Sequence, residues 1–469
     1  MRTKVYIDDA SKSFFLILLV SQLFFSNGII LLIGLIIFYS LFYALQQPYK
    51  PSVFSIILFY HFLQISAGIW LSNYLNKDIS FRSPSAVYAT LAAYAGLVFL
   101  FTPIIYYQNK LPALTLKTLT QHANLLSIDK TFRVYVISFF VMNALTGIAF
   151  LVPSLTQIIF SVSNIKWFLF LLFGLQSILK NKRRREFILF CVLEFAMGFY
   201  SYFSEFKTIL FFILFLFLCL LYKAEFKKLA LAVVAIVLIG YGAIFWTSVK
   251  GEYRIFLNQG TNTQTVQVEE ADALNKLIEL SQKSNNNTFS DATEDFLDRL
   301  QYTYHLAKTM DRVPVAIPFQ YGDNWATTLG FVLTPRFINP NKGVYDASVK
   351  ASKYTGIRYS GIQRGVSVSL GYFADGYIDF GFVGMFAILL ILGFIYGSSY
   401  FYFMRKSSTN FIFNIAVVGA IYMELFAFES DNIFVAGRLY GNLVVFFLLK
   451  IFLFPHLIRY IKSPTQLSN

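Results

Sequence analysis

Charged residues are scarce in this sequence of 469 residues: they make up 14% of it, whereas hydrophobic residues make up 57% and aromatic residues 19%. With a mean hydropathy of +0.59, this composition excludes an ordinary soluble globular protein. Cysteine is also scarce. Cys191 and Cys219 both lie inside apolar runs, which argues against a disulfide framework or a cysteine-based metal site. The scarcity of charge therefore indicates an integral membrane protein.

Motifs for metal or nucleotide chemistry are missing as well. The sequence has no HExxH, no GxSxG and no P-loop, and its histidines are scattered at positions 61, 122, 305 and 456. These absences weigh against metal-dependent hydrolysis and nucleotide-driven transport. We expect neither a metal site nor another cofactor.

Long apolar runs are the main feature that is present. They reach the roughly 17–25 residues that cross a membrane as helix, and they lack the alternation of barrel strands. The first run, residues 14–45, contains Ser-Asn-Gly at 26–28, which predicts a tight hairpin of two short helices. The other runs lie near 53–75, 85–107, 133–150, 164–179, 187–204, 206–222, 229–247, 382–402, 411–428 and 436–454. The sequence thus predicts an all-α polytopic membrane protein with about twelve spans.

Basic residues are distributed unevenly among the loops. If the N-terminus is cytoplasmic, the short outside loops hold only Lys77, Arg82 and Lys166, and most other loop cations lie inside. The positive-inside rule then places both termini in the cytoplasm. A basic inner rim facing anionic lipid accounts for the net charge of +14 without a nucleic-acid partner.

This topology divides the chain into three parts. Residues 1–247 form a bundle of about nine helices, residues 248–380 an outer loop, and residues 381–469 about three further helices with a cytoplasmic tail. The first half of the loop is acidic and predicts helices at 268–283 and 291–307, with a turn at "SNNNT" between them. The second half is rich in Pro, Gly and cations, and we expect it to be irregular.

Several cations lie at or just beyond the expected outer surface. Lys207, in "YSYFSEFKTILFF", lies at the outer end of a predicted hairpin, and Lys250 and Arg254 follow a span. Such cations are costly unless they meet an anion, and a lipid-linked phosphate or pyrophosphate would suit them. Each could instead form a local ion pair, as Lys207 with Glu205. The same set contains Arg299, Arg336, Lys342, Arg364 and Arg438.

Two acids lie at the end of the loop, in "GYFADGYIDFGFVG". Asp375 and Asp379 are four residues apart and share one face of any helix. They could position or deprotonate a sugar hydroxyl, but we favour capping or cation pairing where a surface helix turns into the membrane. The glycines at 371, 376, 381 and 384 predict close helix packing and a sharp turn.

Taken in order, these segments resemble the Wzy-type polymerases of O-antigen and oligosaccharide repeat units, which are membrane glycosyltransferases with about a dozen helices and a large outer loop. The pattern covers nearly the whole chain, although Gly343 follows Lys342 where the family often has Pro or Arg-Pro. The segments that carry the resemblance are "YFSEFK", "WTSVKGEYR", "TPRFINPNK", "GYFADGYIDFGFVG" and "ESDNIFVAGR".

The resemblance implies a C-type-like, metal-independent glycosyltransferase in the bacterial cytoplasmic membrane, with an extracytoplasmic loop. Its donor and acceptor would be undecaprenyl-pyrophosphate-linked oligosaccharides; membrane lipids, and as a candidate a chain-length regulator protein, would be further partners. The expected catalytic residues are Arg254, Arg336, Asp375 and Asp379, with Glu205 and Asp431 as further candidate bases. The expected pyrophosphate-binding residues are Lys207, Lys250, Arg299, Lys342, Arg364 and Arg438.

Three alternatives stay open. A ligase of lipid-linked polysaccharide would use the same parts and differ in its acceptor. A transporter of lipid-linked oligosaccharide would more often show paired halves and polar residues at the bilayer midplane, a description that only His61, Glu194 and Glu424 approach. A purely structural membrane subunit is the third alternative.

Overall fold

Helix accounts for nearly all the regular structure. The computed structural model describes residues 5–149, 156–200, 206–260, 267–283, 286–334, 339, 342–343, 345–359, 361, 367–423 and 428–463. Within these residues lie nineteen α-helices and two short strands, β1 (Tyr6–Ile7) and β2 (Lys223–Ala224), which pair in parallel. The all-α fold class is therefore confirmed.

Each predicted apolar run of the N-terminal part contains helix, and α5 is a further helix that the runs do not predict. The hairpin over 14–45 is confirmed, with the two helices α1 (Asp9–Ser21) and α2 (Gly28–Leu45) separated by the 3₁₀ turn Gln22–Phe24. A second 3₁₀ turn, Ile79–Phe81, follows α3. The remaining helices of this part are α3 (Val53–Tyr74), α4 (Ala86–Asn109), α5 (Leu116–Asn124), α6 (Ile128–Ile148), α7 (Thr156–Lys180), α8 (Arg184–Tyr200), α9 (Phe206–Cys219) and α10 (Phe226–Leu257).

One loop assignment in this part is wrong. Helix α7 begins at Thr156, so Lys166 lies well inside it and not in an outside loop. The lysine is tolerated there because its ammonium group pairs with Glu194 of α8.

Residues 248–380, which we call the outer segment after their predicted location, are more helical than predicted. This segment contains α11 (Glu270–Lys283), α12 (Asn286–Leu300), α13 (Thr303–Arg312), α14 (Asp323–Leu333) and α15 (Ala347–Thr355). The prediction of an irregular second half is therefore wrong for α14 and α15.

The helix predicted over 291–307 is also interrupted. It breaks between α12 and α13, because the Tyr302 amide also donates to the Gln64 carbonyl of α3 at 3.3 Å. The turn expected at "SNNNT" is wrong for the residues from Asn286 onward, which belong to α12. Residues 284 and 285 lie outside the described part of the chain.

The C-terminal part begins with α16 (Tyr372–Lys406), in which Phe380 and Gly381 have non-helical backbone angles. The glycine prediction is confirmed. Gly371 and Gly381 have φ of +86° and +66°, and a Cβ built on Gly376 would lie 3.0 Å from the Met385 Cα. The two halves of α16 are thus folded closely against each other at the kink. The last helices are α17 (Phe411–Tyr422), α18 (Asn432–Phe452) and α19 (Phe454–Ile461).

Six helices among the described residues are long and apolar enough to cross a membrane: α2, α3, α4, α7, α16 and α18. Helices α9 and α17 contain apolar stretches that are shorter. These helices make the chain compatible with a membrane protein, and the number of about twelve spans stays a prediction.

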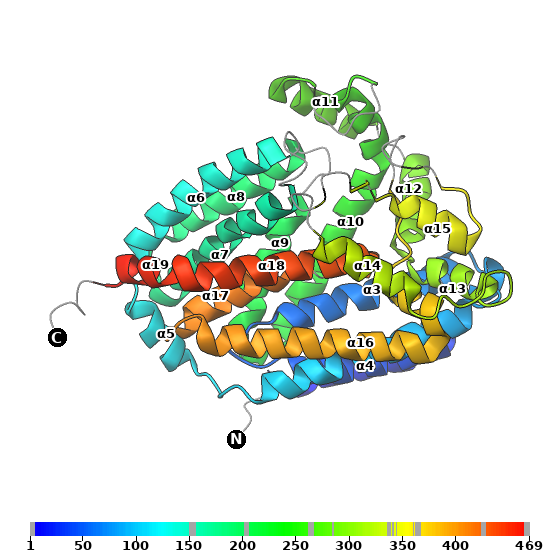
Figure 1. The fold of residues 1–469 in the computed structure, drawn as a ribbon, viewed down its shortest axis with the longest axis horizontal. Helices are drawn as coiled ribbons and strands as arrows, with labels where there is room; N and C mark the ends of the chain where they lie inside the picture. Colours follow the sequence, from blue (N-terminus) through cyan, green and yellow to red (C-terminus); the bar gives the residue numbers. More distant parts are fainter. Residues whose placement is uncertain are drawn as a thin grey trace.

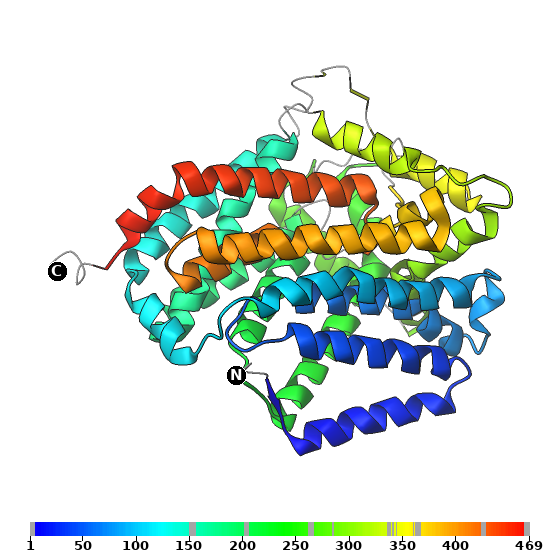
Figure 2. The same ribbon diagram turned by 60° about the horizontal axis from the view of Figure 1, so that its bottom comes forward.

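The long helices run side by side, and α16 packs along α4 (Figure 2). Helices α13 and α15 lie at one end of this bundle, whereas α5 and α19 lie at the other (Figure 1). Helix α11 lies to one side of the bundle, and α14 lies next to α18 (Figure 1).

Candidate functional site

Two buried carboxylates meet where α15, α16 and α18 converge. Asp375 of α16 is 0% exposed, and Asp431, which precedes α18, is 1% exposed. The Lys350 ammonium of α15 lies 2.6 Å from Asp375 Oδ1 and donates to Asn432 Oδ1 at 2.9 Å. The Tyr345 hydroxyl donates to Asp431 Oδ2. We call Tyr345, Lys350, Asp375, Asp431 and Asn432 the carboxylate cluster.

Backbone groups fix both carboxylates in place. Asp375 Oδ2 accepts a hydrogen bond from the Asn432 amide at 2.7 Å. Asp431 is the N-cap of α18, and its Oδ1 accepts from the Phe434 amide at 3.3 Å. The start of α18 is therefore attached to the start of α16 through the two acids, since such caps satisfy amides that have no partner within the helix.

The surroundings of Asp431 favour its protonated form. Burial and the neighbouring Asp375 charge raise the pKa of Asp431 to about 6, although Lys350 and the Tyr345 hydroxyl oppose this rise. Burial and the Asp431 charge raise the pKa of Tyr345 as well, so its hydroxyl stays protonated. A carboxylate with such a pKa can take up or release a proton near neutral pH, which is what a general base requires.

Aromatic rings flank the cluster. The Tyr345 ring centroid lies 6.0 Å from that of Phe331 of α14 and 6.0 Å from that of Phe434 of α18. The Lys342 ammonium lies 3.7 Å from the centre of the Phe331 ring. Tyr345 and Lys350 are half-buried, whereas Asp375, Asp431 and Asn432 are buried. An outside molecule could therefore reach the buried acids through Tyr345.

Asp379 has a different role from Asp375. Its two carboxylate oxygens accept from the Asn324 and Trp325 amides, both at 3.1 Å, at the start of α14. The Asn324 side chain in turn donates to the Asp375 carbonyl at 3.0 Å. The capping interpretation thus describes Asp379, and the cation-pairing interpretation describes Asp375.

The cations predicted to bind pyrophosphate are dispersed. Lys342 donates to the Thr334 carbonyl at 3.0 Å and to the Phe331 carbonyl, and so holds the end of α14. Lys250 and Arg254 share the helix α10, as expected, and α10 packs mainly on α11 and α12. Arg299 on α12 and Arg438 on α18 are exposed.

Some predicted residues fall outside the described part of the chain. These are Arg336, Arg364 and Glu205, together with the side chain of Lys207, whose backbone lies in the first turn of α9. The structure therefore leaves their roles as predictions.

Sequence reasoning missed three members of the cluster. Lys350 was one of several cations in its stretch, and Tyr345 and Asn432 had no distinguishing pattern. The only available signal for the cluster was Asp431 in "ESDN", because an acid directly before an apolar helix is a typical N-cap. The partners of the acids come from segments far away in the sequence.

A second polar group lies inside the bundle. The Lys166 ammonium of α7 lies 2.9 Å from Glu194 Oε2 of α8 and donates to Asn143 Oδ1 of α6 at 3.0 Å. It also lies 4.3 Å from the centre of the Trp167 ring. We call Lys166 and Glu194 the buried ion pair. Both residues are buried, so each charge relies on the other for compensation.

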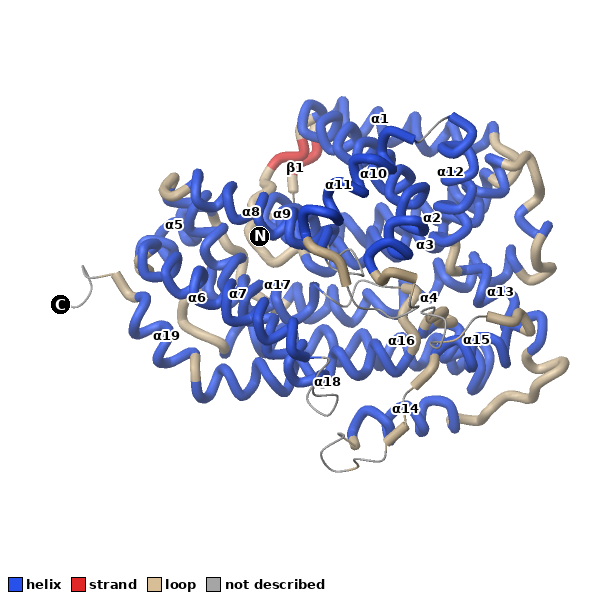
Figure 3. The backbone as a smooth tube through the Cα atoms, turned by 90° about the horizontal axis from the view of Figure 1, so that it is seen from above, coloured by secondary structure: helices blue, strands red, loops and turns tan. Residues whose placement is uncertain are grey.

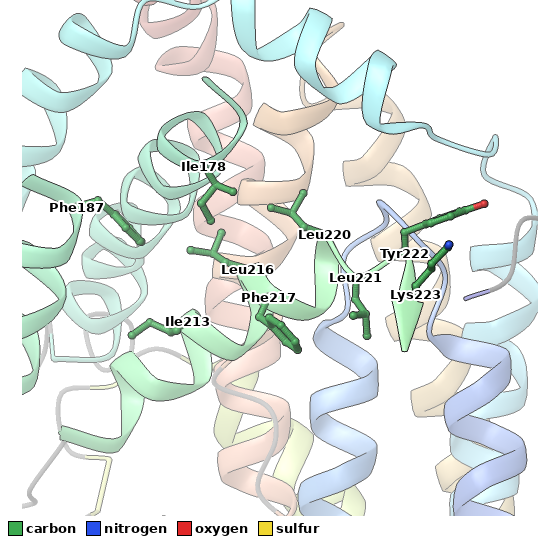
Figure 4. A pocket seen from close by; sticks show the side chains of 9 residues that line it. All are labelled: Ile178, Phe187, Ile213, Leu216, Phe217, Leu220, Leu221, Tyr222 and Lys223. Carbon is green, nitrogen blue, oxygen red and sulfur yellow. The ribbon is translucent and has the colours of Figure 1, made fainter. Parts of the chain in front are cut away.

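A groove between α7, α8 and α9 offers no comparable chemistry. It has a volume of about 450 Å³ and is lined by apolar side chains such as Phe187, Leu216 and Phe217, with Tyr222 and Lys223 at its margin (Figure 4). Among the described residues, no group of three His, Cys, Asp or Glu side chains could hold a metal ion. The carboxylate cluster is therefore the stronger candidate site.

One family model matches the sequence. The family is described as a domain of unknown function (DUF8712), and the match covers residues 84–433, well over half of the chain and all five members of the carboxylate cluster. The search of curated proteins and the search of solved structures each return no match.

Proposed function

The chain belongs to the DUF8712 family, and we propose that it is a membrane glycosyltransferase that polymerises lipid-linked oligosaccharides at the outer face of the bacterial cytoplasmic membrane. The observation that carries the proposal is the carboxylate cluster, in which the pKa of Asp431 is raised to about 6. The order of the segments that resemble Wzy-type polymerases supports the choice of reaction.

The acceptor hydroxyl has to lose a proton as its oxygen bonds to the anomeric carbon of the donor. In our proposal the acceptor donates to the Tyr345 oxygen while the Tyr345 hydroxyl donates to Asp431. The proton of the acceptor passes to Tyr345, and the Tyr345 proton passes to Asp431. The bond from the anomeric carbon to the lipid pyrophosphate breaks, and the pyrophosphate leaves with the electron pair.

Lys350 keeps the acids in the state that this step needs. It lies 2.6 Å from Asp375 and so compensates one of the two buried negative charges. Asp431 is then the acid that exchanges its proton near neutral pH. We assign Asp375 and Lys350 as positioning residues and Asp431, through Tyr345, as the base.

The pyrophosphate requires cations, which stabilise charge on a leaving group without a metal. Arg336 and Arg364 belong to the same stretch of sequence as Tyr345 and Lys350, and we propose them as the principal ligands. Lys207, Lys250, Arg254, Arg299 and Arg438 are further candidates from the sequence. Lys342 already binds the end of α14, so we give it a structural role.

One observation favours a second function. The buried ion pair of Lys166 and Glu194 is the kind of buried polar group that transporters place within the membrane. Transport of a lipid-linked oligosaccharide is therefore the alternative to be tested. A ligase would use the carboxylate cluster in the same way and would differ only in its acceptor.

The test uses purified protein in nanodiscs with a lipid-pyrophosphate-linked oligosaccharide and a gel that resolves chain length. We expect a ladder of products from the wild type. Asp431→Asn should slow its formation by about 10²–10⁴-fold, as for loss of a general base. Asp272→Asn on α11, where the acid is exposed, is the matched control and should leave the ladder unchanged.

The other outcomes identify the alternatives. A single transfer to a different acceptor, without lengthening, would indicate a ligase. Absence of any product with authentic substrate, combined with movement of the lipid across a liposome bilayer, would replace the proposal with transport.

A further inference from the structure

Helix α14 differs in composition from the other helices of the outer segment. Its sequence, "DNWATTLGFVL", has a single charged residue, Asp323, at its first position. Helices α11, α12 and α13 each carry several charges. On α14 the side chains of Leu329 and Leu333 are 47% and 54% exposed. A helix that has no charge beyond its first residue and that exposes leucines is unusual for a segment surrounded by water.

Both ends of α14 are capped by side chains from elsewhere in the chain. Asp379 accepts from the Asn324 and Trp325 amides at one end. Lys342 donates to the Phe331 and Thr334 carbonyls at the other. Helix ends carry amides and carbonyls without intrahelical partners, and where water is scarce the protein itself must satisfy them.

The inner face of α14 packs on helices that are candidates to span the membrane. It contacts α18 and α16, and a Cβ built on Gly437 would lie 3.8 Å from Val332 Cγ2. Gly437 is five residues beyond the first residue of α18, which is roughly 7.5 Å along the helix axis. The far end of α14 therefore reaches more than one turn down α18.

Exposed apolar side chains of α16 and α18 lie next to α14. Phe380 of α16 is exposed, and a Cβ built on Gly322, directly before α14, would lie 3.3 Å from its ring. Phe434 of α18 is exposed, and its ring lies 6.0 Å from that of Tyr345, which lies 6.0 Å from that of Phe331 on α14. Figure 1 places α14 along α18, and Figure 3 places it at the edge of the molecule.

We propose that α14 lies in the outer leaflet of the membrane, with Leu329 and Leu333 in contact with lipid acyl chains. The helix is then an interfacial anchor inside the outer segment and not part of a water-exposed loop. Its three supports are the absence of charge after Asp323 in α14, the capped ends and the exposed apolar side chains of α16 and α18 beside it. The inference does not depend on the proposed glycosyltransferase activity.

The test places a nitroxide spin label on single cysteines in nanodiscs and measures relaxation by oxygen, which partitions into lipid, and by a water-soluble nickel chelate. The variants are Leu329→Cys and Leu333→Cys, whose positions are exposed and tolerate a label. Val383→Cys on α16 is the lipid control and Glu279→Cys on α11 the water control. Protein without an added cysteine is the labelling blank, because Cys191 is half-buried and Cys219 buried.

We expect the ratio of oxygen to nickel relaxation at both leucine positions to match that at Val383→Cys and to exceed that at Glu279→Cys severalfold. A ratio equal to the water control at both positions would overturn the proposal. Low accessibility to both reagents, with dipolar broadening between labels, would show that a second copy of the chain covers this face, and would overturn it too.

Discussion

The ionisation of Asp431 should make stability depend on pH. Its pKa of about 6 in the folded chain is above the value of about 3.9 for an unperturbed Asp, so the folded chain binds more protons between these values. The contribution of this residue to the free energy of unfolding is thus present below about pH 4 and lost as pH rises through about 6. From the pKa shift, we expect the loss to be about 3 kcal/mol.

The measurement is thermal unfolding in detergent, followed by tryptophan fluorescence, at a series of pH values from 4 to 7.5. Asp431→Asn keeps a side chain that can cap α18 and should remove this part of the pH dependence. If wild type and variant show parallel profiles, Asp431 does not have a raised pKa. Transfer activity should have the opposite sign, rising with pH, because the base is active only when ionised.

The ion pair of Lys166 and Glu194 should be more sensitive to single than to double replacement. Lys166→Met leaves the Glu194 carboxylate buried without its ammonium partner, and we expect a loss of about 3–5 kcal/mol in the free energy of unfolding. The double variant Lys166→Met/Glu194→Leu leaves no buried charge and should recover most of that loss. Unfolding in mixed detergent micelles measures both.

The double variant also separates the two functions. If the pair is structural, the refolded double variant should form product ladders at the wild-type rate. A double variant as unstable as Lys166→Met would contradict the compensation argument. A stable double variant that has lost lipid movement across the bilayer would support transport.

At the scale of elements, the spacing between α16 and α4 depends on glycine. A Cβ built on Gly393 would lie 2.2 Å from the Leu100 carbonyl oxygen, a backbone atom of α4. Gly393→Ala must therefore push the two helices apart, at a cost of about 1–3 kcal/mol in the free energy of unfolding. Gly330→Ala on α14, with no atom within 4 Å of its Cβ, is the control. It should be neutral or slightly stabilising, because alanine favours helix.

Thermal unfolding of the two variants side by side measures the difference. Equal unfolding temperatures would show that α16 and α4 can separate without cost. In that case the glycines of α16 would matter at the kink and not along the interface with α4.

The sequence predicts the long helices well because each is a long apolar run between polar loops. It predicts helix ends less well, since these depend on contacts between distant segments. Helix α14 is short, lies among prolines and is capped by Asp379 and Lys342, which the helix pattern does not include. The break between α12 and α13 likewise depends on the Gln64 carbonyl of α3. Local periodicity carries no information about such partners.

At the scale of the whole molecule, the candidate site shows the same limit. The sequence singles out Asp375 and names Asp431 as a candidate base, because acids near apolar helices are rare in this chain. It does not pair them, since Tyr345 and Asp431 are 86 residues apart and Asp375 and Asn432 are 57 apart. Only the packing of α15, α16 and α18 brings these residues together. The sequence also predicts that many cations gather near one pyrophosphate. Among the described residues, no comparable set of contacts brings these cations together.

The orientation of the whole chain in the membrane decides whether the carboxylate cluster can meet an outside substrate. The basic loop between α7 and α8, which contains Lys182, and the basic N-terminal segment, which contains Lys12, should face the cytoplasm. In spheroplasts, a membrane-impermeant maleimide should therefore label Asp272→Cys on α11 without treatment. It should label Lys12→Cys and Lys182→Cys only after permeabilisation. All three positions are exposed, so a failure to react reports the side of the membrane and not burial.

The reverse pattern would put α11 and the outer segment in the cytoplasm, and a lipid-linked donor at the outer face could not reach Tyr345. Labelling of Lys182→Cys together with Asp272→Cys, but not of Lys12→Cys, would keep the cluster outside. It would show that the predicted number of spans is wrong both before α8 and between α8 and α11.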